Sequence, residues 1–256
     1  MPTPLSTSVR GSVGVPHHGA LTDASALPAR GPGFVRLRAD DVRWGNPRLV
    51  AAITRAAARV AAEAPGGEPL VVGDLARRHG GRAPHHRSHR TGRDADLLFY
   101  TTTPDGRPRR SPGFVRFEPD GLAPTPDGGF VRLDVARVWL LVRALLLEPE
   151  AEIQWLFASR TLEGLLLEEA RARAEPEPLV ARAASVLRQP GDSAPHDDHL
   201  HLRIACTPEE EVAGCEGGGR RWRWLRAAPA PTKLEDAALL AALLSDAPAP
   251  GGAASF

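Results

Sequence analysis

Histidines are concentrated in two short segments of this 256-residue chain. Nine are present; four lie between His79 and His89, and three lie between His196 and His201. Clustered imidazoles with a carboxylate nearby are typical ligands of zinc and related divalent metals. The clustering therefore predicts a metal site. The alternative is a solvated, histidine-rich loop that binds metal only adventitiously.

The second segment spaces its histidines as a strand would. His199 and His201 lie within the alternating run 199–205, and residues two apart in a strand point to the same face. Asp96 opens a predicted strand after the first segment, so His89 and Asp96 can converge on the same place. Two imidazoles and one carboxylate leave a fourth position open, as in a catalytic zinc site. Zinc in such a site lowers the pKa of a bound water to about 7 and polarises a carbonyl.

One histidine of the 199/201 pair can ligate while its neighbour acts as general base or donates to a developing oxyanion. Zinc suits this donor set, although other divalent ions also occupy such sites. Ser88 lies beside the first cluster without a G-x-S-x-G nucleophile elbow, so serine catalysis is not expected. Three nearby arginines are candidates for binding a substrate carboxylate: Arg87, Arg90 and Arg93.

The order and spacing of these residues resemble a known group of metallopeptidases. The pattern His89-x6-Asp96 followed by His199-x-His201 is similar to the zinc pattern of the LAS metallopeptidases, which include lysostaphin-type enzymes, D-Ala-D-Ala peptidases and the hedgehog domain. Within that group the chain most resembles the penicillin-insensitive murein endopeptidase family. The stretches that carry this resemblance are 31–34, 43–47, 72–74, 80–81, 86–96 and 196–203, followed by the cysteine pair.

The resemblance implies a ligand set for one zinc ion. His89, Asp96 and His201 match the zinc ligands of the family. His86 lies three residues before His89 and matches a further active-site histidine, so it is either an additional ligand or a group beside the metal. Asp94 is interpreted as a structural turn or strand residue rather than a ligand.

The resemblance also implies catalytic roles. His199 matches the histidine that stays beside the metal and acts in catalysis, and His196 matches another active-site histidine. Either one can donate a proton to the leaving amine. Asp197 or Asp198 can orient one of these imidazoles. Asp198 itself remains an alternative general base, since related D,D-dipeptidases place an acidic residue at that spacing.

The implied function is a zinc-dependent murein D,D-endopeptidase. Such an enzyme uses a zinc-activated water, without a serine nucleophile, to hydrolyse the D-alanyl to meso-diaminopimelyl cross-links of peptidoglycan in the periplasm. Two alternatives remain open: a zinc D,D-carboxypeptidase or dipeptidase acting on D-Ala-D-Ala, and a non-catalytic peptidoglycan-binding domain of the same fold. The oligomeric state is left open.

The elements that must position these residues predict an α+β fold, in which a small antiparallel sheet is flanked by helices and carries a single catalytic zinc site. Asn46-Pro47 and Asp134 are helix-start signals. Helices are predicted at 47–64, 135–147, 161–174, 179–187 and 234–244, and strands at 70–73, 96–102, 113–117, 152–157 and 199–205. We expect an extended arm over 1–33, a metallopeptidase domain over 34–245 and a loose tail over 246–256.

Composition narrows the function classes. The 32 basic and 31 acidic residues give a formal net charge of +1, which disfavours a general nucleic-acid binder. All basic residues except Lys233 are arginines, which weakens any inference from one arginine alone. No run approaches the ~18 apolar residues of a transmembrane helix. The first ten residues lack the apolar core of a signal peptide, so none is expected at this start, although the family is exported.

Two smaller features each allow two interpretations. Cys206 and Cys215 are nine positions apart and could close a small disulfide loop or be two separate thiols. The resemblance favours the disulfide. The cluster 220–224 (RRWRW) could contact an anionic glycan or a membrane surface, but an edge strand with its tryptophans packed inward is the favoured interpretation.

Overall fold

The computed structural model describes residues 11–83, 85–191 and 193–226. A seven-stranded sheet runs through this part of the chain, in the order β14-β13-β15-β8-β7-β5-β4. Its strands are β4 (Arg30–Gly31), β5 (Phe34–Arg36), β7 (Leu70–Val72), β8 (Asp94–Leu98), β13 (Ile153–Phe157), β14 (Leu187–Arg188) and β15 (His199–Ile204). Two of its pairings, β13 with β14 and β5 with β7, are parallel, and the others are antiparallel. The expected mixture of helices and strands is confirmed, but the sheet is mixed and larger than predicted.

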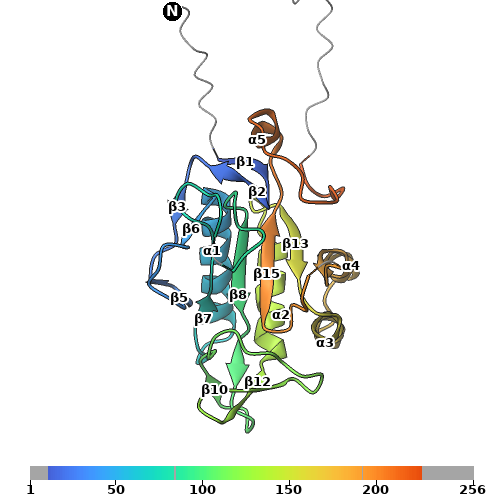
Figure 1. Cartoon of the computed structure of the whole chain (residues 1–256). Helices are drawn as coiled ribbons and strands as arrows, with labels where there is room; N and C mark the ends of the chain where they lie inside the picture. The colour runs from blue at the N-terminus through green and yellow to red at the C-terminus, as the bar shows by residue number, and fades with distance from the viewer. Residues whose placement is uncertain (1–10, 84, 192, 227–256) are drawn as a thin grey trace, which may run out of the picture. The chain divides into compact units, whose positions relative to one another are not determined.

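Five helices accompany the sheet among the described residues: α1 (Pro47–Glu63), α2 (Val135–Leu146), α3 (Arg160–Ala172), α4 (Glu177–Val186) and α5 (Pro208–Val212). The helix-start signals are confirmed, because the side chains of Asn46 and Asp134 cap α1 and α2 by accepting from the backbone N–H of Arg48 and Arg137. In Figure 1, α1 and α2 lie behind the central strands, where their apolar faces and the sheet form one buried core.

Smaller sheets complete the fold. The predicted arm contains β1 (Ser12–Val15), β2 (His18–Leu21) and β3 (Ser25–Ala26). β1 pairs with β2, and β3 pairs with β6 (Trp44–Gly45). A four-stranded sheet contains β9 (Thr101–Thr102), β10 (Pro108–Arg109), β11 (Leu122–Pro124) and β12 (Phe130–Leu133). Residues 1–10, the predicted helix 234–244 and the tail 246–256 lie outside the described residues, and the proposed domain boundaries stay a prediction.

Two predicted strands are wrong. Residues 113–117 form no strand, since Gly113 has a φ of 117° and the Phe117 N–H donates to the Asp197 carbonyl at 2.9 Å instead of joining a ladder. Residues 220–224 form no edge strand either, although their tryptophans do turn inward: the Trp222 Nε1–H donates to the Gln154 carbonyl at 2.8 Å. In both segments, aromatic side chains pack against the core, and the backbone pairs with no neighbouring strand.

Candidate active site

β8 and β15 bring the two histidine segments together. They are antiparallel neighbours, and the register pairs His201 with Asp96 and Arg203 with Asp94 (Figure 1). Directly opposed residues share a face of the sheet, and so do residues two apart along a strand. These four side chains and His199 therefore lie on one face, which the spacing predicts for His199 and His201.

One carboxylate oxygen lies at the centre of the site. Asp96 Oδ1 is 3.3 Å from His89 Nε2, 3.2 Å from His201 Nδ1 and 3.3 Å from His199 Nε2. Asp96 and His89 are buried. Among the described residues, His89 Nε2 and both Asp96 oxygens make no hydrogen bond. Buried polar atoms without partners are rare in folded proteins, and this nitrogen–oxygen donor set matches the ligand chemistry of zinc, so the residues present fit a divalent metal.

The outer nitrogens of two imidazoles are already occupied. His89 Nδ1 lies 2.9 Å from the Leu75 carbonyl, and His201 Nε2 lies 2.8 Å from Asp94 Oδ1. Each imidazole then donates its single N–H outward and keeps a lone pair directed at the Asp96 carboxylate. Outward hydrogen bonds of this kind fix the tautomer and the ring orientation of metal-binding histidines.

Asp94 is the functional candidate that sequence reasoning missed. Its carboxylate is fully buried and also accepts from Arg203 Nε at 2.6 Å. Burial would raise the pKa of this carboxyl, but Arg203 and His201 outweigh it and hold the pKa well below its usual value. The signal in the sequence was the alternation of Asp94 with Asp96, which puts both on one face of β8. Its opposing partners become known only from the strand register.

His86 is close to the same carboxylate, but its ring is bonded to Asp74. Its Nδ1 is 3.8 Å from Asp96 Oδ2, while its Nε2 is 2.8 Å from Asp74 Oδ2. Asp74 also accepts from Arg38 at 2.8 Å; these two partners outweigh burial and lower the pKa of the Asp74 carboxyl. His86, His89 and Asp96 form one group with donor atoms close enough to hold a metal ion.

His196, His199 and His201 form a second such group. The pKa values of two of these histidines are shifted in opposite directions. Burial opposes the charged form of both. Asp96 and Asp198 outweigh it at His199 and raise its pKa to about 10. At His196, burial together with the nearby imidazoles lowers the pKa to about 4. His199 Nδ1 lies 2.5 Å from Asp198 Oδ1, while His196 Nδ1 is buried without a partner among the described residues.

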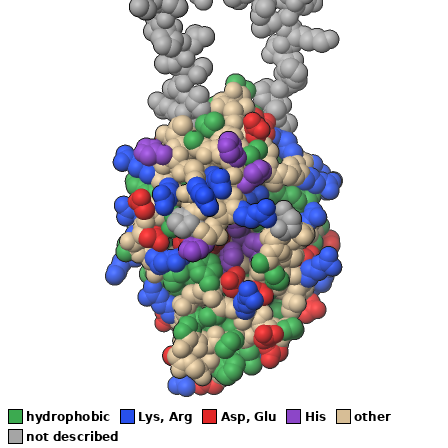
Figure 2. Space-filling view, in the orientation of Figure 1, with side chains coloured by type: hydrophobic (Ala, Val, Ile, Leu, Met, Phe, Trp, Pro, Cys, Tyr) green, Lys and Arg blue, Asp and Glu red, His purple; other side chains and the backbone are tan. Residues whose placement is uncertain are grey.

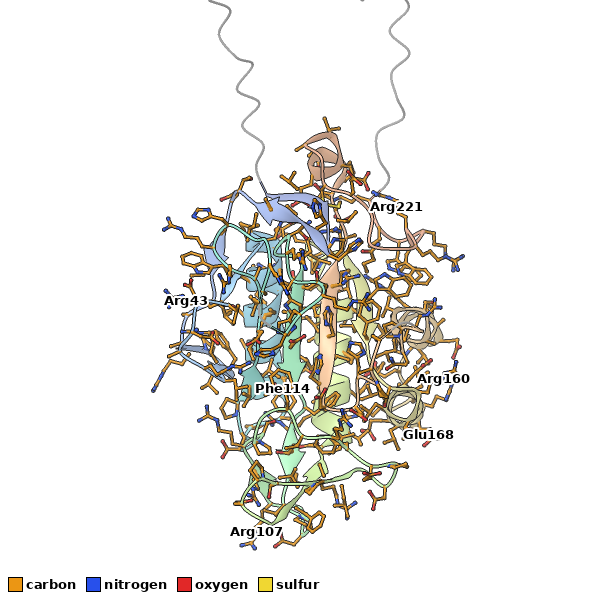
Figure 3. All side chains as sticks on the ribbon, in the orientation of Figure 1. Arg43, Arg107, Phe114, Arg160, Glu168 and Arg221 are labelled. Carbon is orange, nitrogen blue, oxygen red and sulfur yellow. A yellow bond between two sulfur atoms is a disulfide. The ribbon has the colours of Figure 1, made fainter. Side chains whose placement is uncertain are left out.

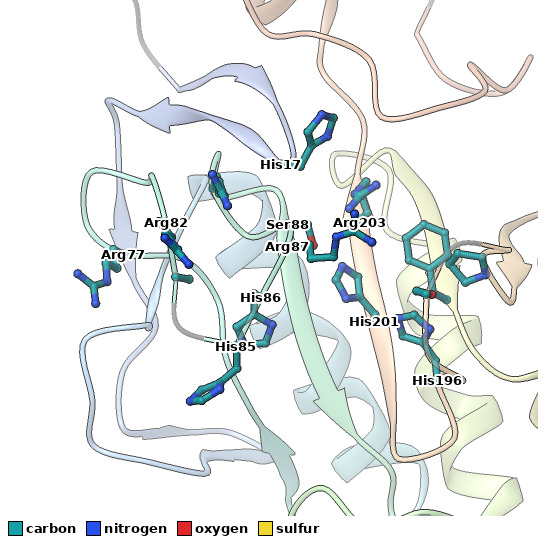
Figure 4. A pocket seen from close by; sticks show the side chains of 15 residues that line it. His17, Arg77, Arg82, His85, His86, Arg87, Ser88, His196, His201 and Arg203 are labelled. Atoms are coloured by element: carbon teal, nitrogen blue, oxygen red, sulfur yellow. The ribbon is translucent and has the colours of Figure 1, made fainter.

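The histidines open onto a cleft of about 1060 Å³. His86, His196 and His201 line it, as Figure 4 shows, together with Phe157 and several arginines. In Figure 2, histidine side chains lie in a hollow on this face, with arginine, acidic and hydrophobic side chains around it. The cleft lies at the upper end of the size range of small-ligand sites and has room for a peptide.

Phe114 adds an aromatic ring beside the candidate catalytic histidine. It lies on the loop after β10 and is 37% exposed (Figure 3). Its ring meets that of His199 edge-on, with the centroids 5.3 Å apart. The predicted strand at this position offered no indication of the contact, which depends on how the loop folds back over β15.

Of the three flanking arginines, Arg87 and Arg90 line the cleft, but Arg93 does not. Arg93 is fully buried and donates to the carbonyls of Glu216 and Gly217 at 2.6 and 2.9 Å, and burial lowers its pKa to about 10. In the segment after β15, a disulfide joins Cys206 to Cys215, so the interpretation as two separate thiols is wrong.

Buried imidazoles and carboxylates converge beside a peptide-sized cleft, and their donor atoms lie close enough together to hold a metal ion. Comparison with known proteins finds a similarity over part of the chain: the family model of the penicillin-insensitive murein endopeptidases matches residues 12–112. A penicillin-insensitive murein endopeptidase of Klebsiella pneumoniae is 36% identical over 90 residues, and one of Haemophilus influenzae is 34% identical over 98 residues. These alignments cover 34% and 38% of this chain.

The resemblance to this family is thereby confirmed. The matched part of the chain contains His86, His89 and Asp96, whereas the segment with His199 and His201 lies beyond it. The aligned part spans about a third of each relative, 32% and 34% of their lengths. Among the described residues, no helix is both long and apolar enough to cross a membrane.

Proposed function

We propose that this chain is a zinc-dependent peptidoglycan hydrolase, a D,D-endopeptidase that cleaves D-alanyl to meso-diaminopimelyl cross-links. The observation that carries the proposal is the convergence of two imidazole nitrogens on one carboxylate oxygen. His89 Nε2 lies 3.3 Å and His201 Nδ1 lies 3.2 Å from Asp96 Oδ1, and all three residues are buried. The family match supports the substrate class, because both relatives carry the name murein endopeptidase.

His89, Asp96 and His201 would hold the metal, and His86 is the candidate for a further contact. When bound, a zinc ion supplies Lewis acidity, activating a water and polarising the scissile carbonyl. The protein supplies the rigidity of the site. Leu75 holds His89 and Asp94 holds His201, so neither ring is free to rotate away from the carboxylate.

His199 is assigned the proton-handling role. Its Nε2 points at the reacting centre beside Asp96, and its Nδ1 is bound to Asp198. In this position His199 can donate a hydrogen bond to the oxyanion that develops on the scissile carbonyl. Asp198 contacts His199 rather than the centre, so we assign it a positioning role.

His196 lies on the other side of His199, with the ring centroids 5.3 Å apart, and lines the cleft. Its unpartnered Nδ1 can accept a proton and pass it to the leaving amine. Hydrolysis then needs one donor and one acceptor, and the two histidines provide both without a side-chain nucleophile.

We also propose that the protein acts in the periplasm on the peptide cross-links of the wall. The Cys206–Cys215 disulfide supports an oxidising compartment.

Digestion of purified cross-linked muropeptide dimers, compared with uncross-linked pentapeptides, tests the activity. Loss of dimers alone supports the endopeptidase. Release of D-alanine alone would replace it with the carboxypeptidase alternative, and binding without cleavage would indicate a non-catalytic domain.

Two variants test the roles. His201→Ala should remove both zinc and activity, whereas His199→Ala should remove activity and retain most of the zinc, measured by metal analysis and chelator-reversible digestion. Near-normal turnover of the His199→Ala variant would contradict its assignment. Arg59→Gln, on the exposed face of α1, is the matched control.

A further inference from the structure

The cleft is strongly asymmetric in charge. Five arginines line it: Arg77, Arg82, Arg87, Arg90 and Arg203. No aspartate or glutamate is among its described lining residues. A wall of one charge sign beside low-dielectric surfaces focuses the field and attracts a ligand of the opposite charge.

Some arginines elsewhere are paired with carboxylates, as in the pairs Arg38–Asp74, Arg48–Glu210 and Arg55–Glu148. Arg203, which lines the cleft, is likewise paired with Asp94.

Arg90 is the most informative member. It directly follows His89 and is partly buried, with an Nε that is buried and lacks a hydrogen-bond partner. Its guanidinium forms no ion pair with a described residue. Its backbone, by contrast, is fixed on both sides: its N–H donates to the Pro16 carbonyl at 3.1 Å, and its carbonyl accepts from Gly81 at 2.9 Å. A partly buried guanidinium on a fixed backbone, without an ion pair among the described residues and lining the same cleft as the histidines, is suited to bind an anionic group of a ligand.

We propose that Arg77, Arg82 and Arg90, which we call the arginine wall, bind a carboxylate of the peptide substrate close to the hydrolysed bond. The proposal rests on the proposed function for the peptide nature of the ligand. A planar guanidinium matches a carboxylate in a bidentate fork. Two members of the wall, Arg77 and Arg82, are labelled in Figure 4, and Arg90 follows on the loop 85–90 that carries His86 and His89.

A matched pair of ligands isolates this interaction. The probe is one synthetic cross-linked stem-peptide dimer, made with free carboxylates and again with carboxamides in their place. Hydrolysis is followed as kcat/KM, and binding is measured separately by calorimetry on the full chain. Wild type should prefer the carboxylate form by about 10- to 100-fold, the range for a hydrogen-bonded charge pair.

The variants are Arg90→Gln, Arg90→Lys and Arg82→Gln, with Arg59→Gln as the control outside the cleft. We expect the carboxylate preference to fall about tenfold or more in Arg90→Gln, to be partly restored in Arg90→Lys, to fall less for the exposed Arg82, and to be unchanged in the control. If Arg90→Gln folds poorly, the carboxylate preference of Arg82→Gln still tests the proposal.

The outcomes separate the two proposals. Hydrolysis with no difference between the carboxylate and carboxamide forms would overturn the arginine wall and leave the endopeptidase intact. Absence of hydrolysis, with a carboxylate preference in binding that Arg90→Gln abolishes, would overturn the endopeptidase and leave the wall intact. An equal loss of affinity for both forms in Arg90→Gln would also overturn the wall, since a merely structural arginine acts on both alike.

Discussion

Asp94→Asn is the substitution that most directly tests how the candidate metal centre is built. The Asp94 carboxylate accepts from His201 Nε2 at 2.8 Å and from Arg203 Nε at 2.6 Å, and it is fully buried. Asparagine has nearly the same volume and keeps one acceptor oxygen. The change therefore removes the negative charge without opening a cavity.

The magnitude follows from the two contacts. Losing a partner of this kind behind a metal-binding histidine typically costs 10- to 100-fold in metal affinity, or about 1.4–2.7 kcal/mol. Arg203 also loses its ion-pair partner, with a side chain only 13% exposed. A hydrogen bond to a charged group is worth about 1.5–3 kcal/mol, so we expect the metal-free protein to lose stability within that range.

Zinc affinity is measured by competition with a chelator, and the free energy of unfolding by urea denaturation of the metal-free protein. Asp23→Asn, at an exposed carboxylate, should change neither quantity. A zinc affinity within twofold of wild type in Asp94→Asn would refute the reasoning, because His201 would then not depend on Asp94 for its orientation. Loss of stability with unchanged affinity would reduce Asp94 to the structural role first predicted for it.

Three further predictions address other parts of the fold. Replacing Cys206 and Cys215 together by serine should lower the free energy of unfolding by about 2–3 kcal/mol, the chain-entropy value for so short a loop; urea denaturation that shows a loss below 1 kcal/mol would contradict this. Burial raises the pKa of Tyr100, the only tyrosine, well above 10, so in an alkaline ultraviolet titration the folded protein should form tyrosinate at higher pH than the denatured chain. Its contribution to stability is complete below about pH 10 and is lost as the pH rises further. Phe114→Ala should lower kcat about threefold to tenfold by releasing the His199 ring, with zinc affinity unchanged; an unaltered kcat would show that the contact does not position His199.

The local patterns predicted most of the elements that position the site. Asn46 and Asp134 cap helices as their side-chain chemistry requires, and the alternation in 199–205 corresponds to β15. These features depend on neighbours within a few residues, which the sequence displays directly. The prediction of a strand over 113–117 failed because a stretch with strand propensity was overruled by burial of Phe117 against a distant segment.

The partners of the candidate ligands could not be predicted in the same way. Asp94 meets His201 only because β8 and β15 pair in one particular antiparallel register, across more than a hundred residues of sequence. A slip of one residue would turn Asp94 to the opposite face of the sheet. Asp74 supports His86 for a similar reason, since the hydrogen bonds from Gly73 to Asp96 and from Asp96 to Asp74 fix the end of β7 against β8.

The backbone at His89 gives an independent reason to connect this residue with function. Among the described residues, fifteen glycines and only four other residues have positive φ, and His89 is one of the four, with φ 64°. A non-glycine residue in this region costs of order 1–3 kcal/mol, a cost that persists mainly where the surrounding structure requires the side chain. Here the side chain is buried, and its Nε2 has no hydrogen-bond partner among the described residues. The hydrogen bond between Nδ1 and the Leu75 carbonyl accounts for one ring nitrogen only, and the proposed ligation of a cation at Nε2 would account for the other.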